Sequence, residues 1–255
     1  MPTMLHGSHV RKHTLLAVDI GNTIVNLGVF DNERLRRVKR IVTEEMVAEK
    51  DIGDFREQIQ AVAISSVVPA LTPLFERLAI EHNMKLLVVD HHLDLGIKLG
   101  VEEPSQVGAD RICNAVAAHY MYGSPAIVID FGTAITFDVL GVGGVYMGGN
   151  ILPGALLGAR ALARMTAKLP LIDLRKPENL IGKNTEEAMR AGIFYGVIGG
   201  VTFIYERIRE ELGDAQLILT GGGLELFQED LDIGGVYNPH LTLEGLRMIY
   251  ERNEG

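Results

Sequence analysis

Short apolar runs separated by glycine and asparagine turns dominate the first half of the chain. The runs that predict strands are Leu15–Val18, Ile24–Phe30, Leu35–Val42, Ala61–Ile64 and Lys85–Val89. Leu71, Leu74 and Leu78 recur at helical spacing after Pro69, which predicts a helix over Ala70–His82. This half is therefore expected to mix a small sheet with at least one covering helix.

The second half repeats this order of elements. Strands are predicted at Ala126–Ile129, Ile135–Leu140, Gly144–Ile151 and Leu217–Leu219, and helices at Pro153–Ala167, Thr185–Leu212 and Leu243–Glu251. In each half the first strand ends in an aspartate and a glycine turn, at Asp19 and at Asp130. This weak internal repeat predicts an α/β protein with two similar lobes and a cleft between them. We place the lobes at residues 1–122 and 123–255, with the helix Gly108–Tyr122 joining them.

Charge and cysteine content narrow the class of protein. The chain has 255 residues, with 24 Lys and Arg against 33 Asp and Glu, which gives a net charge of −9. An acidic surface repels phosphodiester backbones, so nucleic acid is not an expected partner. One cysteine, Cys113, cannot form an internal disulfide and fits a reducing compartment, where we expect it to serve packing.

No run of about 18 apolar residues is evident, so no membrane partner is expected. Residues 1–13 hold basic residues and histidines without a long apolar stretch, and do not read as a secretory signal. We expect them to be a native extension or a tag. A cytoplasmic location follows from these observations.

The two aspartate turns are candidates for phosphate binding. The sequence Asp19-Ile20-Gly21-Asn22-Thr23 offers backbone N–H groups and a hydroxyl to an anion, and the carboxylate could hold Mg²⁺ directly or through water. A single copy is equally a hairpin that uses Asp, Gly and Asn for turn chemistry. The second copy, Asp130-Phe131-Gly132-Thr133-Ala134, shifts the balance towards two hairpins that hold a polyphosphate between the lobes.

Two further segments bear on chemistry. Thr220-Gly221-Gly222-Gly223 follows a strand and would let adenosine or its phosphates approach the backbone, or it is simply a helix-entry loop. No Gly-Lys-Ser/Thr sequence occurs, so this is not a Walker A loop. Gly108-Ala109-Asp110-Arg111 sets a carboxylate beside a guanidinium at a helix start, either as an ordinary first turn or as a base next to an anion holder.

Taken together, the motifs resemble those of type III pantothenate kinases. Their order matches throughout, over roughly Leu15 to Asn253. The motifs are Asp19–Thr23, Gly108–Arg111, Asp130–Ala134, Gly148–Gly154, Thr166–Pro170, Gly182–Thr185 and Thr220–Gly222. The resemblance implies the acetate/sugar kinase–Hsc70–actin fold, with two ribonuclease-H-like lobes. It also implies a homodimer and ATP-dependent phosphorylation of pantothenate, the first step of coenzyme A biosynthesis, with Mg²⁺ and a monovalent cation, K⁺ or NH₄⁺.

The resemblance also implies roles for individual residues. Asp110 would be the general base on the pantothenate hydroxyl, Asp130 would hold the monovalent cation, and Asp19 would serve Mg²⁺. The ATP-binding residues would be Asp19, Ile20, Gly21, Asn22, Thr23, Ile24, Val25, Asn26 and Thr133. The pantothenate-binding residues would be Gly108, Ala109, Asp110, Arg111 and Thr185, the last reaching the substrate of the dimer partner.

Two departures keep alternatives open. The family usually has Tyr three residues before the proline that precedes Gly108–Arg111 and Asn directly before it, whereas this chain has Val101 and Glu103 around Pro104. A kinase of another hydroxylated small acid is therefore one alternative. A non-catalytic, transcription-related accessory protein on the same fold is the other, although the candidate catalytic residues are all present.

The stretch Ile193–Ile204 bears on the expected dimer. Its apolar residues cover more than one face of a helix, which suits two neighbours. The alternative is a helix buried wholly within one lobe.

Overall fold

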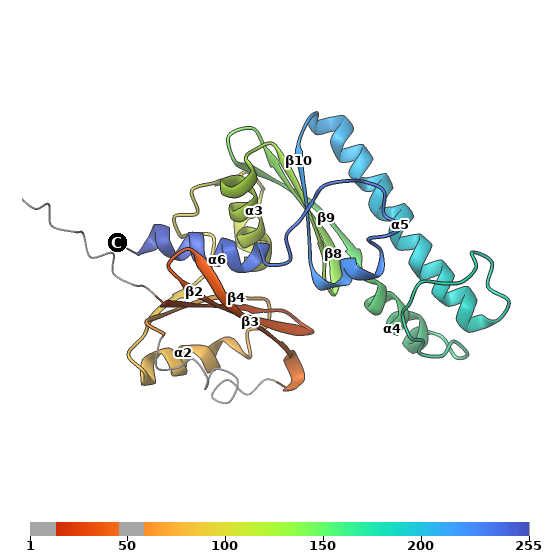
Figure 1. The fold of residues 1–255 in the computed structure, drawn as a ribbon, viewed down its shortest axis with the longest axis horizontal. Helices are drawn as coiled ribbons and strands as arrows, with labels where there is room; N and C mark the ends of the chain where they lie inside the picture. The colour runs from red at the N-terminus through yellow and green to blue at the C-terminus, as the bar shows by residue number, and fades with distance from the viewer. Residues whose placement is uncertain (1–13, 46–58, 255) are drawn as a thin grey trace, which may run out of the picture. The chain divides into compact units, whose positions relative to one another are not determined.

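The computed structural model describes residues 14–45 and 59–254 of the chain. Contacts divide the chain into two compact units, residues 1–89 and residues 90–255, and each is described by itself (Figure 1). The predicted extension at residues 1–13 lies outside the described residues.

The first unit is built on a five-stranded sheet. Its described elements are β1 (Thr14–Ile20), β2 (Ile24–Asp31), β3 (Arg34–Val42), the 3₁₀ turn η1 (Thr43–Glu45), β4 (Ala61–Ser66), α2 (Thr72–Glu81) and β5 (Lys85–Val88). The strand order is β3-β2-β1-β4-β5, with β1, β2 and β3 antiparallel and β4 and β5 parallel to β1. The five strands and the helix predicted for this half are confirmed.

Alternation along β1 decides which side chains enter the core of the first unit. Leu16, Val18 and Ile20 share a buried cluster with Phe75 and other residues of α2. Because successive strand residues point to opposite faces, Asp19 lies on the face away from that cluster. The carboxylate is thereby kept out of the apolar core.

The second unit repeats this sheet with more helices around it. Its elements are β6 (Lys98–Leu99), η3 (Pro104–Gln106), α3 (Ala109–Tyr122), β7 (Ala126–Phe131), β8 (Ala134–Gly141), β9 (Val145–Pro153), α4 (Ala155–Met165), α5 (Thr185–Leu212), β10 (Gln216–Thr220), η4 (Gly222–Leu226), β11 (Val236–Tyr237) and α6 (Leu241–Asn253). The strand order is β11-β10-β7-β8-β9-β6. Strands β7 to β9 are antiparallel, and β10 and β11 continue parallel to β7. The internal repeat is therefore confirmed at the level of strand order.

Helices cover both faces of the second sheet (Figure 1). On one face, Ile127 and Ile129 of β7 pack with Phe194 and Val201 of α5. On the other face, Val128 joins a cluster with residues of α3 and α6. Alternation places Asp130 on this second face.

Helix α5 is more apolar than expected, because the sequence predicts no stretch that could cross a membrane. Among the described helices it passes that test by length and composition, with 28 residues and a mean hydropathy of 1.3 over its apolar window, of which 39% is buried. Phe194, Val201 and Tyr205 account for part of this apolar character because they pack in the core of the second unit. One such helix is weak evidence for a membrane span.

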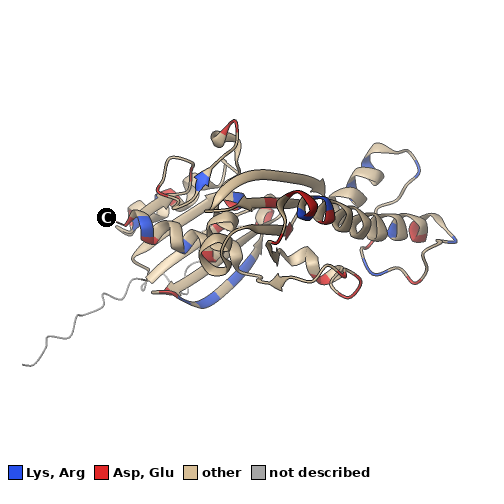
Figure 2. Cartoon of the chain, turned by 90° about the horizontal axis from the view of Figure 1, so that it is seen from above, with Lys and Arg blue, Asp and Glu red and all other residues tan. Residues whose placement is uncertain are grey.

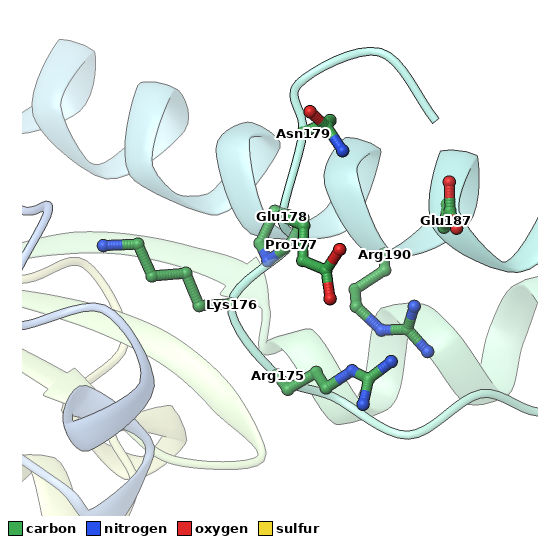
Figure 3. Close-up of a pocket in the computed structure, with 7 residues that line it drawn as sticks. All are labelled: Arg175, Lys176, Pro177, Glu178, Asn179, Glu187 and Arg190. Carbon is green, nitrogen blue, oxygen red and sulfur yellow. The ribbon is translucent and has the colours of Figure 1, made fainter. Parts of the chain in front are cut away.

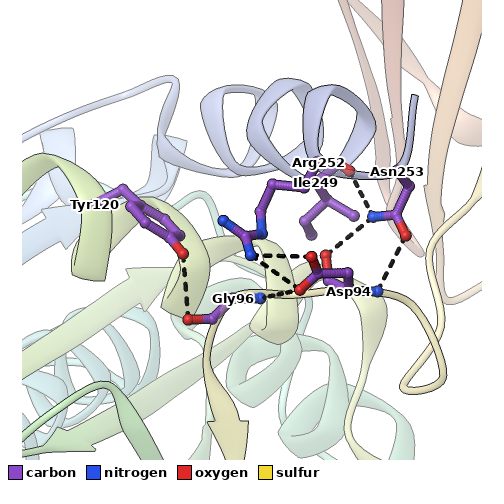
Figure 4. A network of polar contacts seen from close by, with 6 residues as sticks. All are labelled: Asp94, Gly96, Tyr120, Ile249, Arg252 and Asn253. Carbon is purple, nitrogen blue, oxygen red and sulfur yellow. Dashed lines mark hydrogen bonds and ion pairs between the residues drawn. The ribbon is translucent and has the colours of Figure 1, made fainter. Parts of the chain in front are cut away.

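A polar network attaches the segment after β5 to the second unit (Figure 4). Arg252 Nη2 lies 3.0 Å from both carboxylate oxygens of Asp94, and this hydrogen bonding lowers the pKa of Asp94. Asn253 accepts from the Asp94 N–H and donates to its carbonyl, at 3.0 and 2.9 Å. The compact second unit begins at Asp90. The lobe boundary expected after Tyr122 stays a prediction.

The basic residues Arg34, Arg36, Arg37, Lys39 and Arg40 lie at exposed or half-exposed positions of β3, a strand at the edge of its sheet (Figure 2). Charged edge strands of this kind resist strand-to-strand aggregation. Cys113 is fully buried in α3, as expected of a packing residue.

Candidate active site

The first aspartate turn is a tight hairpin between β1 and β2. The Gly21 N–H donates to the Ile24 carbonyl at 3.0 Å, and Thr43 Oγ1 donates to the Gly21 carbonyl at 2.8 Å. Asn22 is exposed at the tip. The predicted loop Asp19–Asn26 thus spans the end of β1, the turn and the first residues of β2.

Asp19 is held by side chains from both neighbouring strands. Ser65 Oγ of β4 donates to one carboxylate oxygen at 3.2 Å, and Asn26 Nδ2 of β2 donates to the other at 3.0 Å. Both residues are the direct register partners of Asp19. These two hydrogen bonds orient the carboxylate at the end of β1.

The second aspartate turn lies between β7 and β8 and is one residue shorter than the first. The Gly132 N–H donates to the Ala134 carbonyl at 3.1 Å, and the Gly154 N–H donates to the Thr133 carbonyl at 3.0 Å. The register partners of Asp130 are Thr136 on β8 and Thr220 on β10. Asp19 and Asp130 therefore occupy equivalent places in the two sheets.

Asp130 is also contacted from a helix. Asn114 Nδ2 of α3 donates to Asp130 Oδ2 at 3.0 Å, and Thr242 Oγ1 of α6 donates to Asn114 Oδ1 at 2.8 Å. Asn114 is 1% exposed, so this link between two helices and the end of β7 is buried. The orientation of Asp130 thus depends on how α3 and α6 pack.

Helix α3 begins with the predicted base and anion holder. Gly108 precedes the helix, Ala109 is its first residue, and Asp110 lies in its first turn. Burial raises the pKa of Asp110, opposed by the backbone N–H and the charge of Arg111. A carboxylate with a raised pKa is a stronger proton acceptor than an exposed one.

Arg111 is fixed against strand β8. Its Nε donates to Asp138 Oδ1 at 2.7 Å and its Nη2 donates to the Phe137 carbonyl at 2.8 Å. Tyr146 of β9 donates its hydroxyl to the same oxygen of Asp138 at 2.8 Å. Because Asn114 contacts β7 and Arg111 contacts β8, the first two turns of α3 bring Asp110 and Asp130 into one region of the second unit.

The glycine-rich segment lies against Asp130. Strand β10 ends at Thr220 and the 3₁₀ helix η4 begins at Gly222, where a helix entrance was expected. Gly221 has a φ of +86°, and a Cβ there would lie 2.4 Å from Asp130 Oδ1. Only glycine is compatible with both this backbone conformation and this close approach.

Thr185 lies elsewhere in the second unit, as the exposed first residue of α5. Asn184 caps the helix by accepting from the Glu187 N–H at 2.9 Å, and Glu187 accepts from the Lys183 N–H at 3.0 Å. This reciprocal cap fixes the start of the helix and with it the position of Thr185.

The oxygen ligands suit a cation that keeps much of its water. Within the described part of the chain, no group of three or more His, Cys, Asp or Glu side chains could enclose a metal. Each aspartate turn supplies one carboxylate, at Asp19 and at Asp130. Mg²⁺ is commonly bound by one or two carboxylates together with waters and phosphates, so Asp19 fits Mg²⁺ that arrives with a nucleotide.

A separate pocket lies beside the start of α5 (Figure 3). It has a volume of about 330 Å³, including space open to solvent, and is lined by Arg175, Lys176, Pro177, Glu178, Asn179, Glu187 and Arg190. Arg190 is 7% exposed, and its Nε donates to the Asp173 carbonyl at 3.1 Å. None of the predicted site residues lines this pocket.

Four buried or half-buried residues of these networks are missing from the sequence prediction: Ser65, Asn114, Asp138 and Tyr146. Asn114 follows Asp110 by four residues and so lies on the same side of the helix. Asp138 is a charged residue within the apolar strand Phe137–Leu140. Asn114 and Asp138 could therefore have been predicted from the sequence. No local pattern indicates Ser65, because its contact with Asp19 depends on strand pairing.

Comparison with solved structures identifies the fold of this protein. The structure is similar to the activator of the 2-hydroxyisocaproyl-CoA dehydratase from Clostridium difficile, with a TM-score of 0.55 and 15% identity, covering 94% of this chain and 95% of that one. It is also similar to the ethanolamine utilization protein EutJ from Carboxydothermus hydrogenoformans, with a TM-score of 0.51 and 16% identity, covering 95% and 92%. At these identities the likeness establishes the fold alone, which is the expected actin-like arrangement of two ribonuclease-H-like units.

Sequence similarity then identifies the family. The model of the type III pantothenate kinase family matches residues 15–207. A type III pantothenate kinase from Agathobacter rectalis is 37% identical over 252 residues, which cover 93% of this chain and 97% of the relative. The chain therefore belongs to the type III pantothenate kinase family.

Proposed function

We propose that this chain transfers the γ-phosphoryl group of ATP to the hydroxyl of pantothenate and yields 4′-phosphopantothenate, the first step of coenzyme A biosynthesis. The observation that carries the proposal is family membership, because the matched residues 15–207 include every proposed site residue from Asp19 to Thr185. The half-buried Asp110 at the start of α3, whose pKa burial raises, supports a kinase that acts on an alcohol.

The proposed mechanism divides the work between the two units. The hairpin residues Asp19, Ile20, Gly21, Asn22, Thr23, Ile24, Val25 and Asn26, together with Thr133, would bind ATP through N–H and hydroxyl donors. Asp110 would accept the proton of the acceptor hydroxyl. In a loose transition state this proton leaves the hydroxyl late. Gly108, Ala109, Arg111 and Thr185 would bind pantothenate.

Cations complete this proposal. Asp19 would hold Mg²⁺, directly or through water, and Asp130 would hold K⁺ or NH₄⁺. Bound cations would offset the negative charge of the phosphates. The carboxylate oxygens of Asp19 and Asp130 are ligands of the kind that these ions take.

The decisive experiment is a kinase assay on the purified chain with Mg-ATP and pantothenate, with and without K⁺ or NH₄⁺. We expect phosphopantothenate to form and its rate to depend on the monovalent cation. Absence of product under all cation conditions would reject the proposal. Tight, specific binding of DNA at physiological salt would instead support the accessory-protein alternative.

The acceptor needs its own test because of Val101. This side chain is half-buried against the cluster that includes Tyr146, so an apolar group stands where the family usually has a phenol. The test measures phosphate transfer from ATP to each of a panel of hydroxylated small acids that includes pantothenate. We expect pantothenate to have the highest kcat/KM, and a better substrate in the panel would reassign the acceptor.

We further propose a cytoplasmic homodimer in which Thr185 reaches the partner's pantothenate. Exposed apolar side chains gather on and around α4 and α5 and support a covered surface there: Leu156, Leu157, Leu162, Met165, Leu171, Leu180, Ile181 and Phe203. Light scattering should give twice the mass of the chain. A particle of monomer mass would overturn the dimer and the shared site.

A further inference from the structure

The second unit contains a buried charge that the proposed reaction does not use directly. Asp138 is fully buried in β8, and its partners in the described structure are Arg111 and Tyr146. Its second oxygen, Oδ2, has no hydrogen-bond partner among the described residues. Burying a carboxylate costs free energy unless an opposite charge pairs with it. The pair with Arg111 offsets this cost, which raises the question of what the buried pair does.

The contacts of Arg111 show what this carboxylate does. A guanidinium has five N–H donors in a rigid fork, and here Nε and one Nη2 N–H are taken by Asp138 and Phe137. The Nη1 donors have no partner among the described residues, while the side chain stays 15% exposed. One edge of the fork is therefore fixed on β8 and the other remains for a ligand.

Strand β9 completes this arrangement. The Arg111 guanidinium lies 6.0 Å from the Tyr146 ring centroid, so Tyr146 contacts both Arg111 and Asp138. A Cβ at Gly149 would lie 1.7 Å from the Phe137 carbonyl oxygen, which accepts from Arg111, and 3.1 Å from Arg111 Nη2. Glycine at 149 thus leaves room for the Arg111 side chain between α3 and the sheet.

We propose that Asp138 and Tyr146 are positioning residues that fix the guanidinium of Arg111 so that its outer edge binds oxygen atoms of the acceptor substrate beside Asp110. This inference rests on the proposed kinase function. In it, Asp138 and Tyr146 touch neither substrate nor nucleotide. They act only through the direction and charge of Arg111.

The variants Asp138→Asn and Tyr146→Phe test this proposal. Asp138→Asn keeps the size and one acceptor oxygen but removes the charge, and Tyr146→Phe keeps the ring but removes the donor to Asp138. We expect KM for pantothenate to rise about tenfold or more in Asp138→Asn and several-fold in Tyr146→Phe, because hydrogen bonds to charged groups are the strong ones. KM for ATP should stay within about twofold, since the hydrogen bonds of Asp138 go to Arg111 and Tyr146 and not to a residue proposed to bind ATP.

A matched control and a double variant separate positioning from structural damage. Tyr122→Phe removes another half-buried hydroxyl of the same cluster, one that accepts from Asn238 at 3.1 Å, and should leave both KM values unchanged. In a chain that already carries Arg111→Ala, Asp138→Asn should raise the KM for pantothenate little further, because Asp138 acts through Arg111. Thermal melting of every variant checks that it is folded.

Outcomes for the two proposals are distinguishable. An unaltered chain with no kinase activity would reject the proposed function itself. An active chain whose Asp138→Asn and Tyr146→Phe variants are folded and keep the original pantothenate KM would overturn the positioning role alone. Equal rises in the KM values of pantothenate and ATP would also overturn it, because they would indicate general damage.

Discussion

The two units have the same sheet but hold their strand-end aspartates differently. Asp19 is held within its sheet, by Asn26 and Ser65 on the two adjacent strands. Asp130 is additionally contacted by Asn114 of α3, which is itself held by Thr242 of α6. The repeated sheet thus provides a carboxylate and a turn in each unit, and in the second unit a helix also contacts that carboxylate.

That helix explains why the units have different proposed roles. Asp110, Arg111 and Asn114 all come from the first two turns of α3, from which Asn114 reaches β7 and Arg111 reaches β8. Alternation puts Asp130 and Asp138 on the same face of the second sheet as this helix. The repeated sheet therefore accounts for two aspartate turns, whereas the proposed acceptor chemistry depends on a helix that packs against the second of them.

The largest expected effect tests the difference in role directly. Asp110→Asn should lower kcat by about 100-fold or more, because it removes the proton acceptor while keeping its size. KM for ATP should change little. Steady-state kinetics measure this effect, and a thermal melt checks that the variant is folded. Turnover near that of the unaltered chain would remove Asp110 from the mechanism.

The second prediction concerns the helix contact to Asp130. Asn114→Ala should raise the monovalent cation concentration needed for half-maximal activity by about tenfold, because Asp130 loses a hydrogen bond that orients it. Thr242→Val, which removes the donor to Asn114 but keeps its shape, should give a smaller rise in the same direction. Unchanged cation activation in both folded variants would show that Asp130 does not depend on α3.

The third prediction is a pH dependence confined to the second unit. Burial raises the pKa of Asp138 to about 6, although Arg111 and Tyr146 favour its charged form and Asp110 adds to the rise. As the pH falls through about 6, Asp138 takes up a proton and its attraction for Arg111 weakens. KM for pantothenate should therefore rise several-fold below pH 6.

Protein stability should respond with the opposite sign, which separates binding from unfolding. The folded-state pKa of Asp138 lies above the ordinary value of 3.8, so this group makes the folded state less stable as the pH rises from about 4 to about 6. Weaker pantothenate binding at low pH would thus not reflect loss of the fold through Asp138. In Asp138→Asn the low-pH rise in KM should disappear, and its persistence would contradict the assignment.

The smallest effect is expected in the first unit. Ser65→Ala removes the hydrogen bond from β4 to Asp19 but leaves that from Asn26 in place. KM for Mg-ATP should rise by no more than about threefold, because the carboxylate stays paired. A loss as large as that of Asn114→Ala would show that the two aspartates are equally dependent on their neighbours.

The sequence by itself determined the elements and the turns of this protein. Alternating apolar runs ending in Asp19 and Asp130 were sufficient to predict both hairpins and the repeated strand order, because strand periodicity and turn chemistry are local. The capped start of α5 at Thr185 follows from local chemistry in the same way. The ordered motifs were also sufficient to indicate the family.

Tertiary structure alone decided which side chains support these motifs. Ser65 meets Asp19 only because β4 pairs with β1, and Asp138 meets Arg111 only because α3 packs on β8. The unit boundary near Asp90 likewise depends on the contact of Asp94 with Arg252, at the far end of the chain. Such partners are distant in sequence, so no local pattern encodes them, and long-range packing fixes them when the chain folds.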